Sequence, residues 1–463
     1  MFTYTEPARE LPIIDDVDVV VAGGGPAGIG AAVAAARTGA RVVLIERYGF
    51  LGGTATAGGM ACMNGFRNQR PPDDYQTVRG VAQEIVDRMI ASGGAQGSYG
   101  IAPYCVPFDP NAFKYAALRM CLDAGVELLL HTRCASVAMV GRRVLGVIVE
   151  TKAERGVVAG QVIVDATGDG DVAAWAGAPF VVAEAPETPL PMGHMFRMGN
   201  LEMDELLADL WARPEAFAGR YPSTETSPAP ALTMEDAARA GLPIGLAGYT
   251  RECFERLGEA RAIRMIVYPD RREALVWGGQ ADADGLDARA LSKAEAHTWR
   301  ETMALVQVLH GAPGFHEAHV IDVAPQVGVR ETRRIVGDYI LTDADVQWGR
   351  QFDDAIAIVA NSTPPMDGHP RTYLAHGGYG VPYRCLLPKG VDGLLVAGRH
   401  LSASHRAFGN LRAIAPMMVI GQAAGTAAAL AAQDDVLPRN VDIPRLRQLL
   451  VAQGSVVARM RDT

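Results

Sequence analysis

Apolar runs separated by glycine-rich turns form the clearest pattern along this chain. One run, Val17 to Ala22, leads into a turn with glycines at positions 23, 25 and 28, and an alanine-rich stretch follows. A second run, Arg41 to Ile45, ends at the acid Glu46. Short apolar runs bounded by turn residues are typical of buried strands, and the stretch between them has the length of a helix. The pattern predicts a strand–helix–strand unit with parallel strands.

The residues of this turn have the chemistry of a dinucleotide site. Gly23 permits a tight turn, Gly25 lets the backbone approach a pyrophosphate, and Gly28 lets the helix pack closely on the sheet. The first-turn amides of the helix are unpaired donors at the positive end of its dipole. Glu46 stands where a carboxylate would accept the ribose hydroxyls of an adenosine. Strand, glycines, helix, strand and acid together make a specific signal.

Other segments continue the pattern. Helical spacing of apolar residues predicts helices at 78–91 and 111–124, the second starting at Asp109-Pro110. Residues 126–150 indicate a hairpin, and apolar strands end at DATGDGD (165–171) and at GLLVAG (393–398). Pro416 fits the first position of a C-terminal helix, in which Gly421 and Gly425 would allow tight packing.

Six segments resemble one family. They are GGGPAGIGAA, ERYGFLGGTATAG, DATGDGD, QVGVRETRRIVGDYILT, VPYRCLLPKGVDGLLVAGR and AIAPMMVIGQAAGTAAAL. In this order they resemble the bacterial FAD-dependent oxidoreductases of the glutathione-reductase-like structural group, over most of the chain except about 200–320. The resemblance implies an α/β fold: a glutathione-reductase-like, FAD-binding Rossmann domain with an interleaved α+β substrate or cap domain. We expect the FAD-binding domain at 1–185 and 381–440, the cap domain at 186–380, and a tail at 441–463 packed on the outside.

The same resemblance implies FAD as the cofactor, and we expect it to be bound non-covalently. His194 is a conceivable attachment site, but no motif supports it. The residues expected to bind FAD come from all of these motifs: Gly23, Gly25, Pro26, Ala27, Gly28, Glu46, Arg47, Gly53, Thr54, Cys134, Thr167, Gly168, Gly398, Arg399, Pro416 and Met417. The N-terminus of the last helix is expected to stabilise negative charge on reduced flavin.

Composition limits the partners. The chain has 463 residues, 49% hydrophobic residues and a net charge of −9, which argues against a general nucleic-acid or anionic-membrane binder. No uninterrupted apolar run reaches the roughly 18 residues of a membrane span. The N-terminus lacks a signal-peptide pattern, so we expect a cytoplasmic protein. The expected partner is a small-molecule substrate, and a homo-oligomer is left open.

The motifs of several other flavoenzyme and metalloenzyme classes are absent from the sequence. The six cysteines show no CxxC spacing, so neither a redox-active disulfide beside the flavin, nor an iron–sulfur cluster, nor a structural disulfide network is expected. No second glycine fingerprint follows Arg47, so a separate NAD(P)H domain is not expected. His316 to His319 lack the spacing of a metalloprotease pair, and we expect no metal site.

The catalytic candidates carry open alternatives. His405, in the loop before the last helix, is the first candidate for a proton acceptor; it could equally hydrogen-bond loop backbone only. Arg330 or Arg384 could bind a substrate carboxylate, with Tyr379 nearby, because guanidinium groups pair with carboxylates. Alternatively the arginines near 330 and 384 pair with acids of the chain and hold the domain junction. His376 is a weaker candidate.

These features predict an oxidoreductase that transfers a hydride between a small organic substrate, carboxylated in one hypothesis, and flavin N5, as a dehydrogenase or oxidase. A flavin monooxygenase is an alternative, although AGRHLSASH replaces the motif that such hydroxylases carry before the last helix. A flavin-carrying subunit of a larger redox or RNA-modifying complex is the other alternative, but the basic extension expected for RNA binding is missing.

Overall fold

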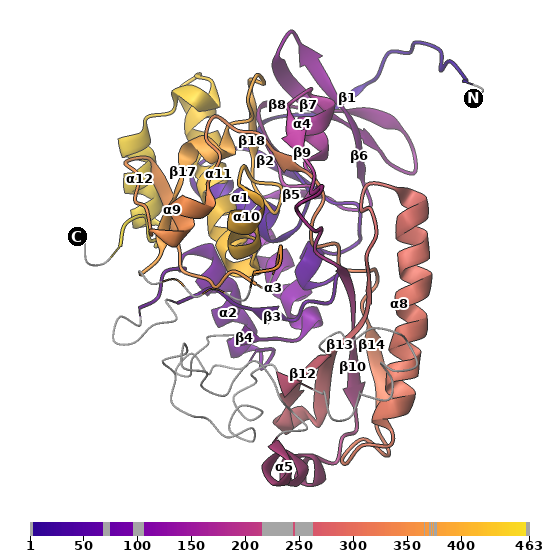
Figure 1. The fold of residues 1–463 in the computed structure, drawn as a ribbon. Coiled ribbons are helices and arrows are strands. Elements are labelled where there is room, and N and C mark those ends of the chain that lie inside the picture. Colours follow the sequence, from indigo (N-terminus) through magenta and orange to yellow (C-terminus); the bar gives the residue numbers. More distant parts are fainter. Residues whose placement is uncertain are drawn as a thin grey trace.

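The computed structural model describes residues 3–67, 75–95, 106–214, 244–245, 263–364, 366–369, 372, 374 and 377–459. The described residues form two packing units, which lie one above the other in Figure 1. We call residues 3–181 and 334–459 the parallel-sheet unit, and residues 192–323 the cap unit. The chain passes between them through two crossing segments, 182–191 and 324–333.

A seven-stranded sheet forms the centre of the parallel-sheet unit. Strands β5, β2, β1, β8 and β18 run parallel, and β7 and β6 continue the sheet antiparallel from β8. Their bounds are β1 (Ile13–Ala22), β2 (Val42–Ile45), β5 (Glu127–Leu129), β6 (Arg133–Val140), β7 (Arg143–Glu150), β8 (Arg155–Asp165) and β18 (Leu394–Val396). The predicted strands and hairpin are confirmed. Their apolar runs are unbroken because helices and loops cover both faces of the parallel part.

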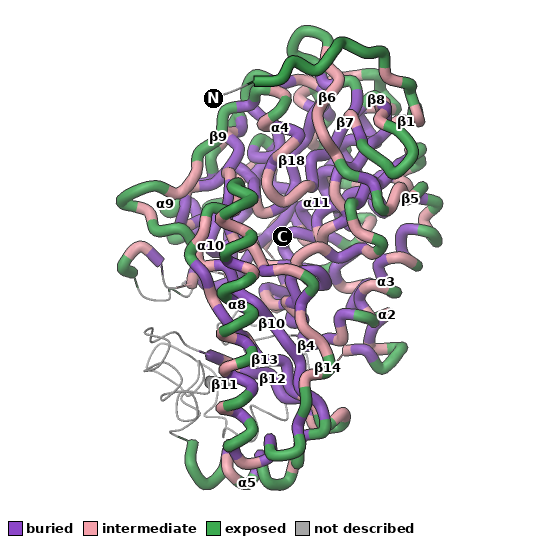
Figure 2. Tube along the Cα trace, turned by 90° about the vertical axis from the view of Figure 1, so that its right-hand side faces the viewer, coloured by how far each residue is buried: buried purple, intermediate pink, exposed green. Residues whose placement is uncertain are grey.

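Helices α1 (Pro26–Arg37) and α11 (Ile414–Gln433) pack closely against each other in this unit. A Cβ on Gly421 would lie 2.0 Å from the carbonyl oxygen of Ala27, and one on Gly425 would lie 1.9 Å from that of Ala31. Only glycine permits such an approach, as predicted. Among the described helices, α11 alone has the length and hydropathy of a membrane span, and its apolar window is wholly buried inside the protein (Figure 2).

The other helices of this unit begin with recognisable signals. Asp109 accepts the amide hydrogen of Asn111 and Pro110 is the first helical residue of α3, so the predicted start signal is confirmed. Leu446 and Leu450 of α12, in the predicted outer tail, are buried, and α12 lies against α11. The bounds are α2 (Val81–Ala91), α3 (Pro110–Asp123), α4 (Asp171–Trp175), α9 (Asp343–Gln347), α10 (His405–Leu411) and α12 (Ile443–Ala452).

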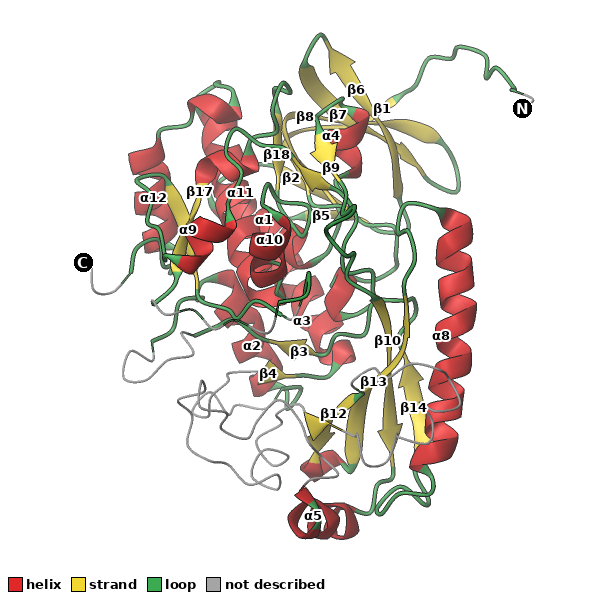
Figure 3. Ribbon diagram, viewed as in Figure 1, coloured by secondary structure: helices red, strands yellow, loops and turns green. Residues whose placement is uncertain are grey.

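The cap unit is an antiparallel sheet with the order β11-β12-β13-β10-β14, and helix α8 covers one face (Figure 3). On the opposite face, Met195, Ile266 and Leu275 join the core of the parallel-sheet unit. The bounds are β10 (Met192–Gly199), α5 (Met203–Ala212), β11 (Ile244–Gly245), β12 (Arg264–Tyr268), β13 (Glu273–Ala281), α8 (Ala288–Leu309) and β14 (His319–Val323). This arrangement has the α+β character expected of the cap.

The end of the cap differs from the expected boundary at residue 380. Short ladders join β9 (Phe180–Val181) to β15 (Arg334–Ile335) and β16 (Ala355–Val359) to β17 (Tyr379–Pro382). Their buried side chains, such as Ile335 and Ile356, belong to the core of the parallel-sheet unit. The range 186–380 therefore spans both units. Sequence reasoning missed this because these strands have the same apolar character as those of the cap.

Candidate functional site

The turn between β1 and α1 leaves room for a ligand at the carboxyl edge of the sheet. Gly23 has φ +106°, and a Cβ there would lie 2.5 Å from the carbonyl oxygen of Ala166. A Cβ on Gly25 would meet no atom within 4 Å, so this glycine borders open space. Gly25 is the N-cap of α1 and no side chain caps the helix. The first-turn amides are therefore available to an anion.

Glu46 lies beside this turn, as its position after β2 predicted. Its carboxylate accepts the amide hydrogens of Gly24 at 2.8 Å and Tyr48 at 2.9 Å. Burial raises the pKa of Glu46 above its usual value, although both amides oppose this. Arg47 extends away and its Nη2 lies 3.4 Å from Oε1 of Gln326, in the second crossing segment.

Several of the predicted cofactor residues gather around the same turn. A Cβ on Gly53, at the start of the 3-10 helix η1 (Gly53–Ala55), would lie 3.0 Å from Cα of Gly25. Gly23 faces Thr167 after β8, and a Cβ on Gly398 after β18 would lie 3.9 Å from Ala27. The predicted loops thus meet at one edge. Cys134, in contrast, lies on β6 at the antiparallel end of the sheet, where burial raises its pKa.

Arg399 and Asp169 form an ion pair that the sequence did not reveal. Oδ1 of Asp169 also accepts the hydroxyl hydrogen of Thr332 at 2.7 Å. Burial would raise the pKa of Asp169, but the charge of Arg399 and these hydrogen bonds outweigh it and hold the pKa below its usual value. The available signal was an acid in the turn after β8; its distant partners could not be identified from spacing.

Helix α11 begins at Ile414, two residues before the predicted start, with Ala413 as its N-cap. Pro416 stands inside the first turn, where its missing amide hydrogen costs nothing because the residue four positions before it lies outside the helix. A Cβ on Gly65 would lie 3.1 Å from Cδ of Pro416, so the loop after β3 (Cys62–Met63) passes over this helix end. Met417 is buried.

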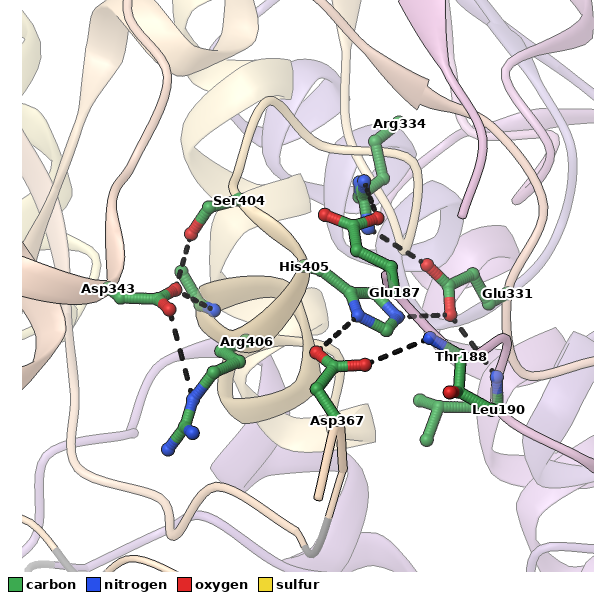
Figure 4. Close-up of polar contacts among 11 residues, drawn as sticks. Glu187, Thr188, Leu190, Glu331, Arg334, Asp343, Asp367, Ser404, His405 and Arg406 are labelled. Atoms are coloured by element: carbon green, nitrogen blue, oxygen red, sulfur yellow. Dashed lines mark hydrogen bonds and ion pairs between the residues drawn. The ribbon is translucent and has the colours of Figure 1, made fainter. Parts of the chain in front are cut away.

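His405 lies between two carboxylates (Figure 4). Its Nε2 is 2.9 Å from Oε2 of Glu331, and its Nδ1 is 2.8 Å from Oδ2 of Asp367. Burial would lower the pKa of His405, but the hydrogen bonds and charges of both acids raise it above its usual value. Two carboxylates at hydrogen-bond distance from both ring nitrogens favour the imidazolium form of the ring. These contacts with two acids argue against the predicted role of His405 as a proton acceptor, and they show that the alternative of backbone bonding alone is wrong.

Tyr379 and Arg384 make contacts within the parallel-sheet unit. The buried hydroxyl of Tyr379 donates to Oδ1 of Asn410 at 2.8 Å, and burial raises its pKa well above the usual range. Arg384, about half exposed, pairs with Asp354 at 2.9 Å, which is the alternative foreseen for the arginines. Neither of these two contacts involves the glycine-rich turns or Arg330.

Arg330 lies where the cap sheet meets the glycine-rich loop. A Cβ on Gly193 of β10 would be 3.1 Å from Nη2 of Arg330. Gly193 and Gly328 exchange backbone hydrogen bonds of 3.2 and 2.7 Å. A Cβ on Gly58 would in turn lie 3.5 Å from Cα of Gly328. Three glycines therefore bring the backbones of the loop, the crossing segment and β10 together, and the guanidinium of Arg330 lies beside one of them, Gly193.

The neighbouring arginines are engaged with acids of the chain. Arg333 pairs with Asp171 at 2.8 Å, and Arg334 pairs with Glu331 at 3.0 Å and with Glu187 at 2.6 Å. For these two, the expectation that arginines hold the domain junction is confirmed.

Cys62, His194 and His376 are the remaining residues for which the sequence raised an expectation. Cys62 is disulfide-bonded, although no structural disulfide network was expected. Nε2 of His194 lies 3.1 Å from the carbonyl oxygen of Ala324, and its ring contacts Trp299 of α8, on the face of the cap sheet away from the glycine turns. His376 lies outside the described residues. In the described ranges, no group of three or more His, Cys, Asp or Glu side chains could hold a metal ion.

One family model matches nearly the whole chain. The chain matches the family model "FAD dependent oxidoreductase" over residues 18–450. Thiamine thiazole synthase of Aeropyrum pernix is 36% identical over 134 residues, which cover 28% of this chain and 43% of that protein. The same enzyme of Methanococcus maripaludis is 40% identical over 77 residues, or 16% of this chain and 28% of that protein. The chain thus matches less than half the length of either relative.

Among solved structures, a geranylgeranyl bacteriochlorophyll reductase-like protein from Thermoplasma acidophilum aligns with 95% of this chain and 83% of its own length. The two are 15% identical, with a TM-score of 0.46.

Proposed function

The chain belongs to the family of FAD-dependent oxidoreductases, and on that premise we propose that it is a dehydrogenase or oxidase that takes a hydride from a small, carboxylated organic substrate. The observation that carries the substrate class is the position of Arg330 at the junction of β10 with the loop around Gly58. A guanidinium group suits a carboxylate because two parallel hydrogen bonds fix both position and orientation.

The donor set of the β1–α1 turn fits FAD. The uncapped first turn of α1 and the open space beside Gly25 would accept the pyrophosphate, and Glu46 would accept the ribose hydroxyls of the adenosine. The first turn of α11 is expected near the flavin ring, with its dipole favouring negative charge by roughly 0.3–2 kcal/mol. When bound, FAD supplies an acceptor for two electrons and a proton. We expect it to be non-covalent.

The residues of the chain then have distinct tasks. Arg330 would hold the substrate carboxylate, and the cap sheet would help to exclude water from the site. In this proposal His405 is not the base, because a carboxylate faces each of its ring nitrogens. The one glycine fingerprint of the chain is occupied by FAD in this proposal, so the electrons come from the substrate itself.

The test starts from the purified protein. Its visible spectrum should show the two bands of oxidised flavin, and acid precipitation should release FAD into the supernatant. Anaerobic mixing with hydroxy acids, amino acids, amines and sugars should bleach the flavin with members of the carboxylated classes. A flavoprotein bleached only by uncharged compounds would refute the substrate class. A pigment retained in the pellet would refute non-covalent binding.

A further inference from the structure

Five buried or half-buried ionisable side chains form one continuous network, which we call the His405 cluster. Its members are Glu187, Glu331, Arg334, Asp367 and His405. The side chains of Glu331 and His405 are each 2% exposed, and that of Arg334 is 4% exposed. In Figure 4 the imidazole ring of His405 stands between the carboxylates of Glu331 and Asp367. Arg334 contacts Glu331 and also Glu187.

The cluster joins both crossing segments to α10. Glu331 belongs to the second segment, and it also accepts the amide hydrogen of Leu190 in the first segment at 3.3 Å. Asp367 accepts the amide hydrogen of Thr188, also in the first segment, at 2.9 Å. His405 is the first residue of α10 and contacts both acids. The only two routes by which the described chain enters and leaves the cap are therefore tied to one imidazole ring.

The charge on that ring decides whether the arrangement holds. With a protonated ring, the cluster has two positive and three negative side chains. A neutral ring keeps one N–H, so one carboxylate would face a ring lone pair, and the cluster would hold one positive charge against three negative ones. Among the described residues, Arg406 also carries a charge near Asp367, and its Nε lies 3.8 Å from Oδ2 of Asp343. Buried carboxylates that lose a charged partner are strongly destabilised.

We propose that His405 is a positioning residue: while protonated, it fixes both crossing segments on α10, and on losing its proton it releases them and loosens the cap. The effect reaches the proposed substrate site because Glu331 directly follows Arg330 in the chain. Release of Glu331 therefore frees the backbone that presents the Arg330 guanidinium beside Gly193. The proposal does not depend on which substrate is used.

Hydrogen exchange of the full-length, FAD-loaded protein between pH 5 and 9 tests this inference directly. Protection factors, corrected for the intrinsic effect of pH, should fall together for the amides of Thr188 and Leu190, whose acceptors are the two carboxylates. The loss should follow the release of one proton, at most about tenfold per pH unit.

Three variants and one control test whether the pH transition depends on His405 and its two acids. His405→Gln should abolish the transition and leave low protection at every pH. Glu331→Gln and Asp367→Asn keep the ring but remove an anion that favours its charge, so the midpoint should move to lower pH, by one unit for each tenfold weakening. His316→Gln, at an exposed histidine, should leave the midpoint unchanged.

A transition that persists in His405→Gln would overturn the proposal, as would a midpoint that stays in place or rises in both carboxylate variants. Should His405→Gln fail to fold, the two carboxylate variants decide the matter, because both retain the ring. Protection of these amides that does not vary with pH in the wild-type protein would also overturn it.

Discussion

Two contacts within the same molecule are built in opposite ways. Where α1 meets α11, backbone touches backbone through Gly421 and Gly425, and no charged group takes part. Where the crossing segments meet α10, charged side chains of the His405 cluster carry the contact. The first contact depends on shape and is insensitive to pH, whereas the second depends on protonation. The flavin-binding unit is thus expected to be rigid, and the cap to be adjustable.

Glu331→Ala should have the largest effect, because it leaves His405 and Arg334 buried without a shared anion. Loss of one member of a buried ion pair lowers the free energy of unfolding by about 3–5 kcal/mol. Denaturant titration at pH 7 measures it. The matched control is Glu205→Ala, at a half-exposed glutamate beside His316, which should change stability by no more than about 0.5 kcal/mol. Equal effects of the two substitutions would remove the distinction between buried and surface pairs.

Gly425→Ala breaks the uncharged contact instead. The new methyl group would lie 1.9 Å from the carbonyl oxygen of Ala31, so the helices must separate, and we expect a loss of about 1–3 kcal/mol or more. The loss should be the same at pH 6 and pH 9. Gly311→Ala, where the nearest atom is 3.4 Å away, is the control. Unchanged stability of Gly425→Ala would show that the close approach of α1 and α11 is not required.

Glu46→Gln should weaken the binding of FAD to the flavin-binding unit. A hydrogen bond to a charged group contributes about 1.5–3 kcal/mol, so FAD should dissociate about 10–100-fold more readily from this variant. Titration of the apoprotein followed by flavin fluorescence gives the dissociation constant. Glu127→Gln, at an exposed position on β5, serves as the control. The same affinity in both variants would argue against a ribose contact at Glu46.

The smallest expected effect is the change of protein stability with pH, which should arise from the His405 cluster and not from the contact between α1 and α11. Because the pKa of His405 is raised, its contribution is fully present below the ordinary histidine pKa and is lost as pH rises through the raised value. Because the pKa of Asp367 is lowered, its contribution is present above the ordinary aspartate pKa and is lost as pH falls through the lowered value. Denaturation midpoints should therefore fall at both ends, and His405→Gln should lack the alkaline decline.

The sequence predicted the parts of the molecule whose chemistry is local. The turn at Gly23, the acid at Glu46 and the start of α3 at Asp109 follow from residues that are neighbours in the chain or in one strand–helix–strand unit. Cytoplasmic location and oligomeric state remain expectations.

Contacts between distant segments were beyond the reach of sequence reasoning. His405 was recognised as a titratable residue near the site, but its partners, Glu331 and Asp367, are 74 and 38 positions away. Without them the sequence does not indicate which protonation state of the ring is favoured. The start of α11 was misplaced for a smaller reason: proline is tolerated throughout a first turn, so Pro416 marks a helix start only to within a few residues.

The most direct test of the proposed function compares anaerobic flavin reduction by one acid that bleaches the protein and by its amide, in the wild-type protein and in Arg330→Ala. We predict that the wild-type protein prefers the acid by about 10–100-fold in apparent affinity, the range expected for a charged hydrogen bond, and that Arg330→Ala loses this preference while keeping its FAD. Arg384→Ala, which alters a surface pair with Asp354, should behave as wild type. An undiminished preference for the acid in Arg330→Ala would contradict the account.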